Sequence, residues 1–275
     1  MDAPSLKGTD YVGRAYGFAF DRFWRVVPSI LLWSLPAMAW TAWPIFLNES
    51  FMAFTSFLVR TIGLNGFIIV YGAATVVIRA ACLAGFSVLR HRDLLAGITP
   101  LNRSAAASLP PYLGYWLLTV LTFAVILMLI GFTVGLVFGT VSRPLLYLIA
   151  LVGIIVVGML VLRAILVFPA IAIGDRQTTL VSAERATRGN GWRIFLGTVQ
   201  VTVPTTLLLA IVLGLAGRYF VALWPDGTGL FIDDALQLLA EFVVATVFVS
   251  YVSLLYAHFN ALPVPAPEGW EAHRL

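Results

Sequence analysis

The sequence "LLYLIALVGIIVVGMLVLRAILVFPAIAI", residues 145–173, contains a single charged side chain, Arg163. A helix needs about 20 apolar residues to cross the roughly 30 Å hydrocarbon core of a bilayer, so this stretch is long enough to span a membrane. The whole chain has the same character, because 60% of its 275 residues are hydrophobic, 11% are charged and the mean hydropathy is +0.95. Such a composition is far from that of a soluble domain and predicts an integral membrane protein.

The hydropathy pattern predicts an all-α fold, a polytopic membrane bundle of six transmembrane helices in three pseudo-repeated hairpins. The predicted spans lie at about 26–47, 63–89, 112–138, 145–173, 195–220 and 231–257, in a single transmembrane domain over 1–262. We also expect cytoplasmic amphipathic helices. The clearest, at 10–25, carries Val12, Tyr16, Ala19 and Phe23 on one face and its charged residues on the other, as an interfacial helix does. Residues 263–275 are predicted to form a short cytoplasmic tail.

The basic residues decide the predicted orientation. Most of the 17 lysines and arginines lie before the first span, after the second and after the fourth, whereas only Arg60, Arg143 and Arg218 lie on the opposite side. By the positive-inside rule, both termini are expected in the cytoplasm. Anionic lipid headgroups on that side account for a pI of about 9.5, so we expect membrane lipids as partners and no nucleic acid.

Short similar segments within the sequence predict an internal repeat. The segment "VVIRAACLAGFSV" at 76–88 aligns with "LVLRAILVFPAIAI" at 160–173, which superposes Arg79 on Arg163, and the last span offers Tyr251 in place of the arginine. The odd-numbered spans begin with "FWRVV" at 23–27, "GYWLL" at 114–118 and "GWRIF" at 191–195. Their tryptophans, Trp24, Trp116 and Trp192, are expected in the aromatic belt at the membrane interface, together with Arg193.

The stretch "TTLVSAERATRGNGWRIF", preceded by a span that ends in "RAILVFPAIAI", resembles a known group of bacterial six-span membrane proteins. These are the proteins grouped with the glycerophosphoryl diester phosphodiesterase membrane domain and the YciC-like inner-membrane proteins. The matching positions are Arg163, Pro169, Ser182, Trp192 and Arg193. The resemblance implies an uncharacterised protein of a bacterial inner membrane. The phosphodiesterases of that group carry their chemistry on a separate soluble domain, so the resemblance carries over the membrane fold and no catalytic residue.

Two arginines stand deep within predicted spans. Arg79 and Arg163 are 11 to 13 residues from the next charge on the cytoplasmic side, which places each roughly 16 to 20 Å deep at 1.5 Å per residue. An intramembrane arginine usually has a partner in the bundle, and Glu241 is the carboxylate predicted to lie well inside a span. Asp233 and Asp234 are predicted at the start of the last helix, where the helix dipole alone explains them. One glutamate and two arginines predict a site with net positive charge.

Three interpretations of this predicted cluster remain open. In the first, Glu241 bridges the arginines and locks the hairpins together, with Tyr251 satisfying further donors. In the second, the uncompensated arginine binds a lipid phosphate or an anionic or amphipathic substrate, since a guanidinium binds phosphate with two parallel hydrogen bonds. In the third, Glu241 lies on a proton or ion pathway.

The third span holds "GFTVGLVFG", with Gly131, Gly135 and Gly139 at helical spacing, which predicts close packing against another helix of this chain, a homo-oligomer or a membrane-protein partner. Nucleophile, nucleotide and metal motifs are missing from the sequence, and the single cysteine, Cys82, excludes a cysteine cluster within the chain. We therefore expect no enzyme, cofactor or metal. From these features we expect a membrane protein that binds or organises anionic lipid, or one that supports another membrane component. The alternative is a small transporter that uses Arg79, Arg163 and Glu241.

Overall fold

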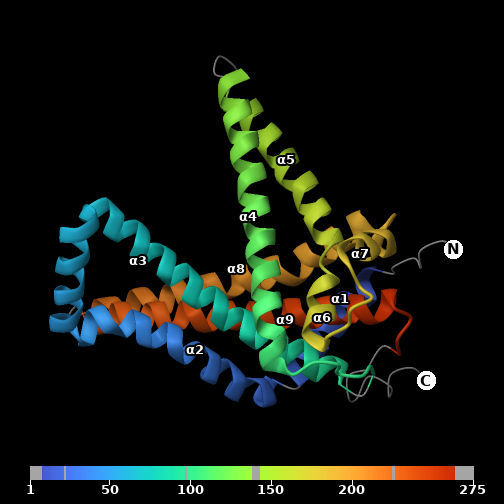
Figure 1. The fold of residues 1–275 in the computed structure, drawn as a ribbon, viewed down its shortest axis with the longest axis horizontal. Helices are drawn as coiled ribbons and strands as arrows, with labels where there is room; N and C mark the ends of the chain where they lie inside the picture. Colours follow the sequence, from blue (N-terminus) through green and yellow to red (C-terminus); the bar gives the residue numbers. More distant parts are fainter. Residues whose placement is uncertain (1–7, 22, 97, 138–142, 225–226, 264–275) are drawn as a thin grey trace. The chain divides into compact units, whose positions relative to one another are not determined.

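The computed structural model describes residues 8–21, 23–96, 98–137, 143–224 and 227–263, and most of these are helical, with no strand among them (Figure 1). The predicted all-α fold is therefore confirmed. The helices are α1 (Gly8–Asp21), α2 (Phe23–Phe46), α3 (Asn48–Leu95), α4 (Ala105–Val137), α5 (Arg143–Arg163), α6 (Val167–Ile173), α7 (Leu180–Thr187), α8 (Gly191–Leu223) and α9 (Thr228–Phe259).

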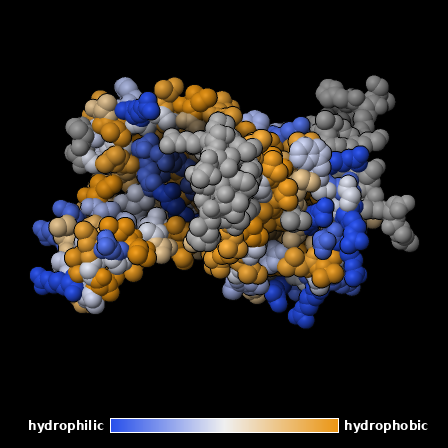
Figure 2. Space-filling model, turned by 90° about the horizontal axis from the view of Figure 1, so that it is seen from above, coloured by the Kyte–Doolittle hydropathy of each residue, from blue (hydrophilic) through white to orange (hydrophobic). Residues whose placement is uncertain are grey.

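Six helical stretches in the described part of the chain are long and apolar enough to cross a membrane. They are Phe23–Phe46, Asn48–Leu95, Ala105–Ile126, Leu151–Ile173, Gly191–Leu223 and Thr228–Phe259, and each overlaps one predicted span. Many of their large apolar side chains are exposed, Ile69 by 70% and Met128 by 76%, and apolar atoms cover much of the surface in Figure 2. A surface of this kind is stable where lipid, not water, is the solvent. The chain is a multi-pass membrane protein.

Two segments differ from the prediction. Residues 48–62, expected as a loop, are helical, and α3 is interrupted only at Gly63, whose φ of 77° and ψ of 168° suit glycine alone. The predicted span 145–173 is not one helix, because α5 ends at Arg163 and α6 begins at Val167. Pro169 supplies the physical reason, since its ring clashes with the carbonyl one turn before it and it has no N–H to donate.

The chain is divided into two compact units. The first unit comprises Met1–Gly17, Val88–Gln200 and Ser250–Leu275, and the second comprises Phe18–Ser87 and Val201–Val249. The first unit therefore contains α4 to α7, with parts of α1, α3, α8 and α9. The second contains α2 and the remaining parts of those four helices.

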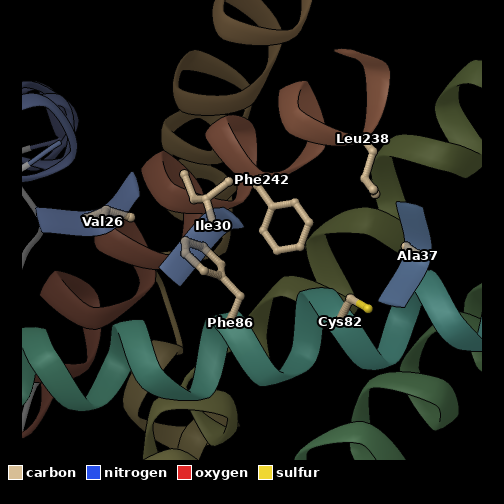
Figure 3. Close-up of a cluster of buried hydrophobic side chains, with 7 residues drawn as sticks. All are labelled: Val26, Ile30, Ala37, Cys82, Phe86, Leu238 and Phe242. Atoms are coloured by element: carbon tan, nitrogen blue, oxygen red, sulfur yellow. The ribbon is translucent and has the colours of Figure 1, made fainter. Parts of the chain in front are cut away.

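In the second unit, α2, α3 and α9 share a hydrophobic core. Its buried side chains are Val26, Ile30 and Ala37 from α2, Cys82 and Phe86 from α3, and Leu238 and Phe242 from α9 (Figure 3). The rings of Phe86 and Phe242 meet edge to face with centroids 5.2 Å apart, a favoured aromatic geometry. This core fixes the mutual positions of the polar residues on the same three helices.

In the first unit, aromatic rings join α4 to α6. Phe168 lies 5.1 Å, centroid to centroid, from both Tyr112 and Tyr115. In α1, the Tyr11 hydroxyl shares a 2.7 Å hydrogen bond with Nδ1 of His258 at the end of α9, and Ala15 is fully buried. The segment predicted as an interfacial helix is therefore partly packed within the protein.

Candidate functional site

A bridged group of three charges lies in the second unit, between α3 and α9. The Arg79 guanidinium donates from Nη2 to Oδ1 of Asp234, and from Nη1 to Oε1 of Glu241 at 3.3 Å. Asp234 and Glu241 lie seven residues apart, which is two helical turns, so both carboxylates project from one face of α9 toward α3. We call Arg79, Asp234 and Glu241 the charge cluster.

Helix α2 also contributes to the charge cluster. The Thr41 hydroxyl donates to Oδ2 of Asp234 at 2.8 Å. One helical turn away from the arginine, Nε1 of Trp40 donates to the Thr75 hydroxyl at 2.9 Å, and the Trp40 ring stacks on Tyr71. Hydrogen bonds and ion pairs thus connect α2, α3 and α9, the three helices that also share the hydrophobic core.

The charge balance of this cluster differs from the prediction. Asp234 was expected to do no more than favour the helix dipole, yet it contacts Arg79 more closely than Glu241 does. With both carboxylates ionised, the cluster carries one negative charge in excess, whereas a net positive site was predicted. The reason is that the long Arg79 side chain reaches both turns of α9 at once. Its guanidinium is therefore already neutralised, and it is not a free anion site.

The two carboxylates are partly accessible. The side chains of Arg79, Asp234 and Glu241 are exposed by 24%, 29% and 41%. Glu241 is thus both the most exposed member and the one held by the longer hydrogen bond. Because a charge in hydrocarbon is costly, a partly exposed carboxylate in a membrane-spanning helix is a candidate for lining a polar path or for accepting a proton or cation.

Asp233 is directed elsewhere. Its Oδ2 accepts a 2.8 Å hydrogen bond from Gln237, and its carboxylate lies against Gly217 of α8, where a Cβ atom would come within 1.7 Å of Oδ1. The expectation that the dipole alone explains Asp233 is therefore wrong. Adjacent aspartates point to different helices because neighbouring helical residues are about 100° apart around the axis.

Arg163 belongs to the first unit and has different surroundings from Arg79. Its carbonyl accepts a 3.2 Å hydrogen bond from Thr187, and its guanidinium lies against Gly191, with Nε 3.0 Å from the position of a Cβ there. Nε is buried and has no hydrogen-bond partner among the residues described. The helix breaks after Arg163, and the arginine lies beside the connector from α7 to α8.

Tyr251 is also in the first unit. It is buried, its hydroxyl donates to the carbonyl of Ile194 at 3.3 Å, and its ring lies against Gly197. The four residues predicted as one cluster are thus divided, with Arg79 and Glu241 in one unit and Arg163 and Tyr251 in the other.

Two glycines other than the predicted ones permit close packing within the described part of the chain. Space for a Cβ is open at Gly131, the surroundings of Gly135 are not described, and Gly139 lies outside the described residues. Instead, a Cβ at Gly85 would lie 2.1 Å from the Trp33 ring, and one at Gly197 would lie 2.1 Å from the Tyr251 hydroxyl. Sequence analysis missed both because it considered glycines repeated every four residues, and neither Gly85 nor Gly197 has another glycine four residues away.

The predicted interfacial side chains lie largely at the surface. Trp24 is 83% exposed and Trp192 is 50% exposed, while Trp116 is half-buried and Arg193 is exposed. Within the ranges described, no group of three His, Cys, Asp or Glu side chains is placed to hold a metal ion. Comparison with protein families, with curated proteins and with solved structures finds no match.

Proposed function

We propose that this is a non-enzymatic bacterial inner-membrane protein, with both termini cytoplasmic, that transports or binds a protonated or cationic molecule at the charge cluster. The observation that carries the proposal is the pairing of two carboxylates, Asp234 and Glu241, with one guanidinium, Arg79. Charges within a span are usually balanced, so the excess negative charge favours binding of a proton or an organic cation.

The geometry favours Glu241 as the acceptor. Asp234 is fixed by Arg79 and by Thr41, whereas Glu241 has one hydrogen bond of 3.3 Å and the greater exposure. A proton or an ammonium group at Glu241 therefore balances the cluster without breaking the closer pair. The interpretation as an anion transporter is less well supported, because the guanidinium it needs at Arg79 is occupied.

A second proposal, a protein that binds or organises lipid, is favoured by Arg163. The Arg163 side chain is partly exposed and lies against Gly191, which directly precedes the exposed Trp192 in the sequence, and this position supports contact of its guanidinium with a lipid phosphate at the membrane interface. This role is compatible with a membrane-protein partner or a homo-oligomer. It also fits the proposed kinship with the six-span inner-membrane proteins that the sequence resembles.

The transport proposal is tested by replacing Glu241 with cysteine in a Cys82→Ala background. This variant retains a balanced pair of Arg79 and Asp234, so the fold is expected to persist. A membrane-impermeant thiol reagent reacts with thiolate, which forms in water and not in hydrocarbon. We expect Glu241→Cys in lipid vesicles to react at least tenfold faster than Leu208→Cys, a control in α8 of the same unit that is 63% exposed and apolar in surroundings.

Equal protection of the two cysteines would show that position 241 faces lipid or packed protein. That result would exclude an aqueous path to the charge cluster and leave it a purely structural connection. Circular dichroism and the melting temperature of each variant serve as the control for folding.

A further inference from the structure

A polar cavity lies in the first unit, where two connectors meet the end of a helix. It has a volume of about 580 Å³ and is bounded by the connector from α3 to α4, the connector from α6 to α7 and the end of α9. Its lining residues include two arginines, Arg103 and Arg176, two residues with side-chain amides, Asn102 and Gln177, and Tyr256. A volume of this size accommodates a small ligand or a lipid headgroup.

The backbone around this cavity is held by specific bonds. The amide of Asn102 donates to the carbonyl of Ile173 at 2.8 Å. Gly174 has a φ of +80°, and a Cβ there would lie 2.7 Å from Cβ of Arg103, so only glycine allows the two connectors to approach this closely. Arg92 donates to the carbonyls of Arg103 and Ala172, at 2.5 and 3.0 Å. The cavity wall that carries Arg103 is therefore preorganised.

The one carboxylate in the lining, Asp175, is already engaged. It accepts hydrogen bonds from the Thr178 hydroxyl at 2.6 Å, the backbone N–H of Gln177 at 2.8 Å and the Tyr256 hydroxyl at 2.7 Å. Burial raises the pKa of Asp175, but these hydrogen bonds outweigh burial and hold its pKa below the usual value. Asp175 thus remains ionised and positions Tyr256.

The two arginines of the lining are available for a ligand. Neither Arg103 nor Arg176 forms an ion pair or a side-chain hydrogen bond within the part of the chain that the structure describes, and both are exposed. With Asp175, the lining carries one net positive charge, and the Arg92 guanidinium adds another beside it. A planar guanidinium forms two parallel hydrogen bonds with a phosphate, and amide groups supply further donors.

We propose that this cavity binds a phosphate monoester or diester, as the headgroup of an anionic phospholipid or as a free small phosphate ester. Arg103 and Arg176 contact the phosphate oxygens, and Asn102 and Gln177 contact the polar substituent. The site lies on the side of the chain that we propose to be cytoplasmic, where anionic lipids and phosphate esters are both present. It is separate from the charge cluster, so it stands or fails independently of the proposed transport function.

The test compares Arg103→Gln/Arg176→Gln with Arg185→Gln/Arg188→Gln in the full chain. Both double variants lose two positive charges, but Arg185 and Arg188 are exposed residues of α7 and its C-cap that do not line the cavity. The first probe is a lipid: native mass spectrometry measures how much phosphatidylglycerol each variant retains, compared with phosphatidylcholine. The second probe is glycerol 3-phosphate, whose binding is measured by the change in melting temperature of the protein in detergent. If the cavity variant does not fold, Arg176→Gln alone, in an exposed part of the connector, replaces it.

If the ligand is a lipid, wild type and the α7 variant retain phosphatidylglycerol at least tenfold more than the cavity variant does, and phosphatidylcholine shows no such difference. If the ligand is a free ester, glycerol 3-phosphate raises the melting temperature of wild type and the α7 variant but not that of the cavity variant. The proposal is overturned if the cavity and α7 variants respond alike to both probes. The arginines would then serve only to offset the carbonyl ends of the helices that meet there.

Discussion

Replacing Arg79 with leucine is expected to lower the free energy of unfolding by about 3 kcal/mol, because it leaves Asp234 and Glu241 together without a cation. Removing one partner of a fully buried ion pair costs about 3 to 5 kcal/mol, and the partial exposure of these side chains places the expected cost at the low end. The measurement is chemical or thermal unfolding in detergent micelles, followed by circular dichroism.

The same experiment has an internal control. The triple variant Arg79→Leu/Asp234→Asn/Glu241→Gln carries no charge in the cluster and is expected to regain most of the lost stability. Glu241→Gln alone should cost less than Asp234→Asn, because Asp234 has the closer contact with Arg79 and also accepts from Thr41. A wild-type melting temperature for Arg79→Leu would contradict the described pairing.

Replacing Gly85 with leucine is expected to abolish the folded state, or to lower its stability by at least about 3 kcal/mol, since overpacking of this severity displaces the neighbouring helix. The first side-chain atom alone would lie 2.1 Å from the ring of Trp33, a partly buried side chain that packs against the core that α2, α3 and α9 share. To make room, the Trp33 ring or the α3 backbone would have to shift, and either shift disturbs the packing of Trp33 against that core.

Gly131→Leu is the matched control for Gly85→Leu. Gly131 is also a glycine within an apolar helix, but a Cβ there meets no atom within 4 Å. Its replacement is expected to change stability by less than about 0.5 kcal/mol. Size-exclusion profiles and melting curves in detergent distinguish the two variants, and equal damage at both positions would contradict the described packing of α2 on α3.

Hydropathy alone predicts where the six apolar helices lie, because the bilayer sets a minimum apolar length that is visible in a linear sequence. Hydropathy does not predict the break after Arg163, because hydropathy does not report where the chain leaves the helical conformation to avoid the clash at Pro169. Segment 48–62 was predicted as a loop because it lies between two apolar stretches, but its helical residues continue up to the glycine that turns the chain.

Only part of the charge cluster could be predicted from the sequence. Arg79 and Glu241 stand out because each interrupts a long apolar stretch, whereas Asp234 is close enough to the start of its helix for the dipole to explain it. Its pairing depends on the direction and reach of the Arg79 side chain across two turns of α9. The polar cavity was not predictable, because its walls come from three segments that are distant in sequence.

The most direct test of the proposed function is carbodiimide labelling of the purified protein across a pH series, with the adduct located by mass spectrometry of peptides. Carbodiimides react with protonated carboxyl groups in apolar surroundings. Since two carboxylates share one guanidinium, the account predicts an adduct on Glu241 that diminishes as the pH rises and is absent from Glu241→Gln. If neither Glu241 nor Asp234 is labelled at any pH at which the protein stays folded, both carboxylates are permanently ion-paired. The cluster would then be a structural connection between helices and not a site for a proton or cation.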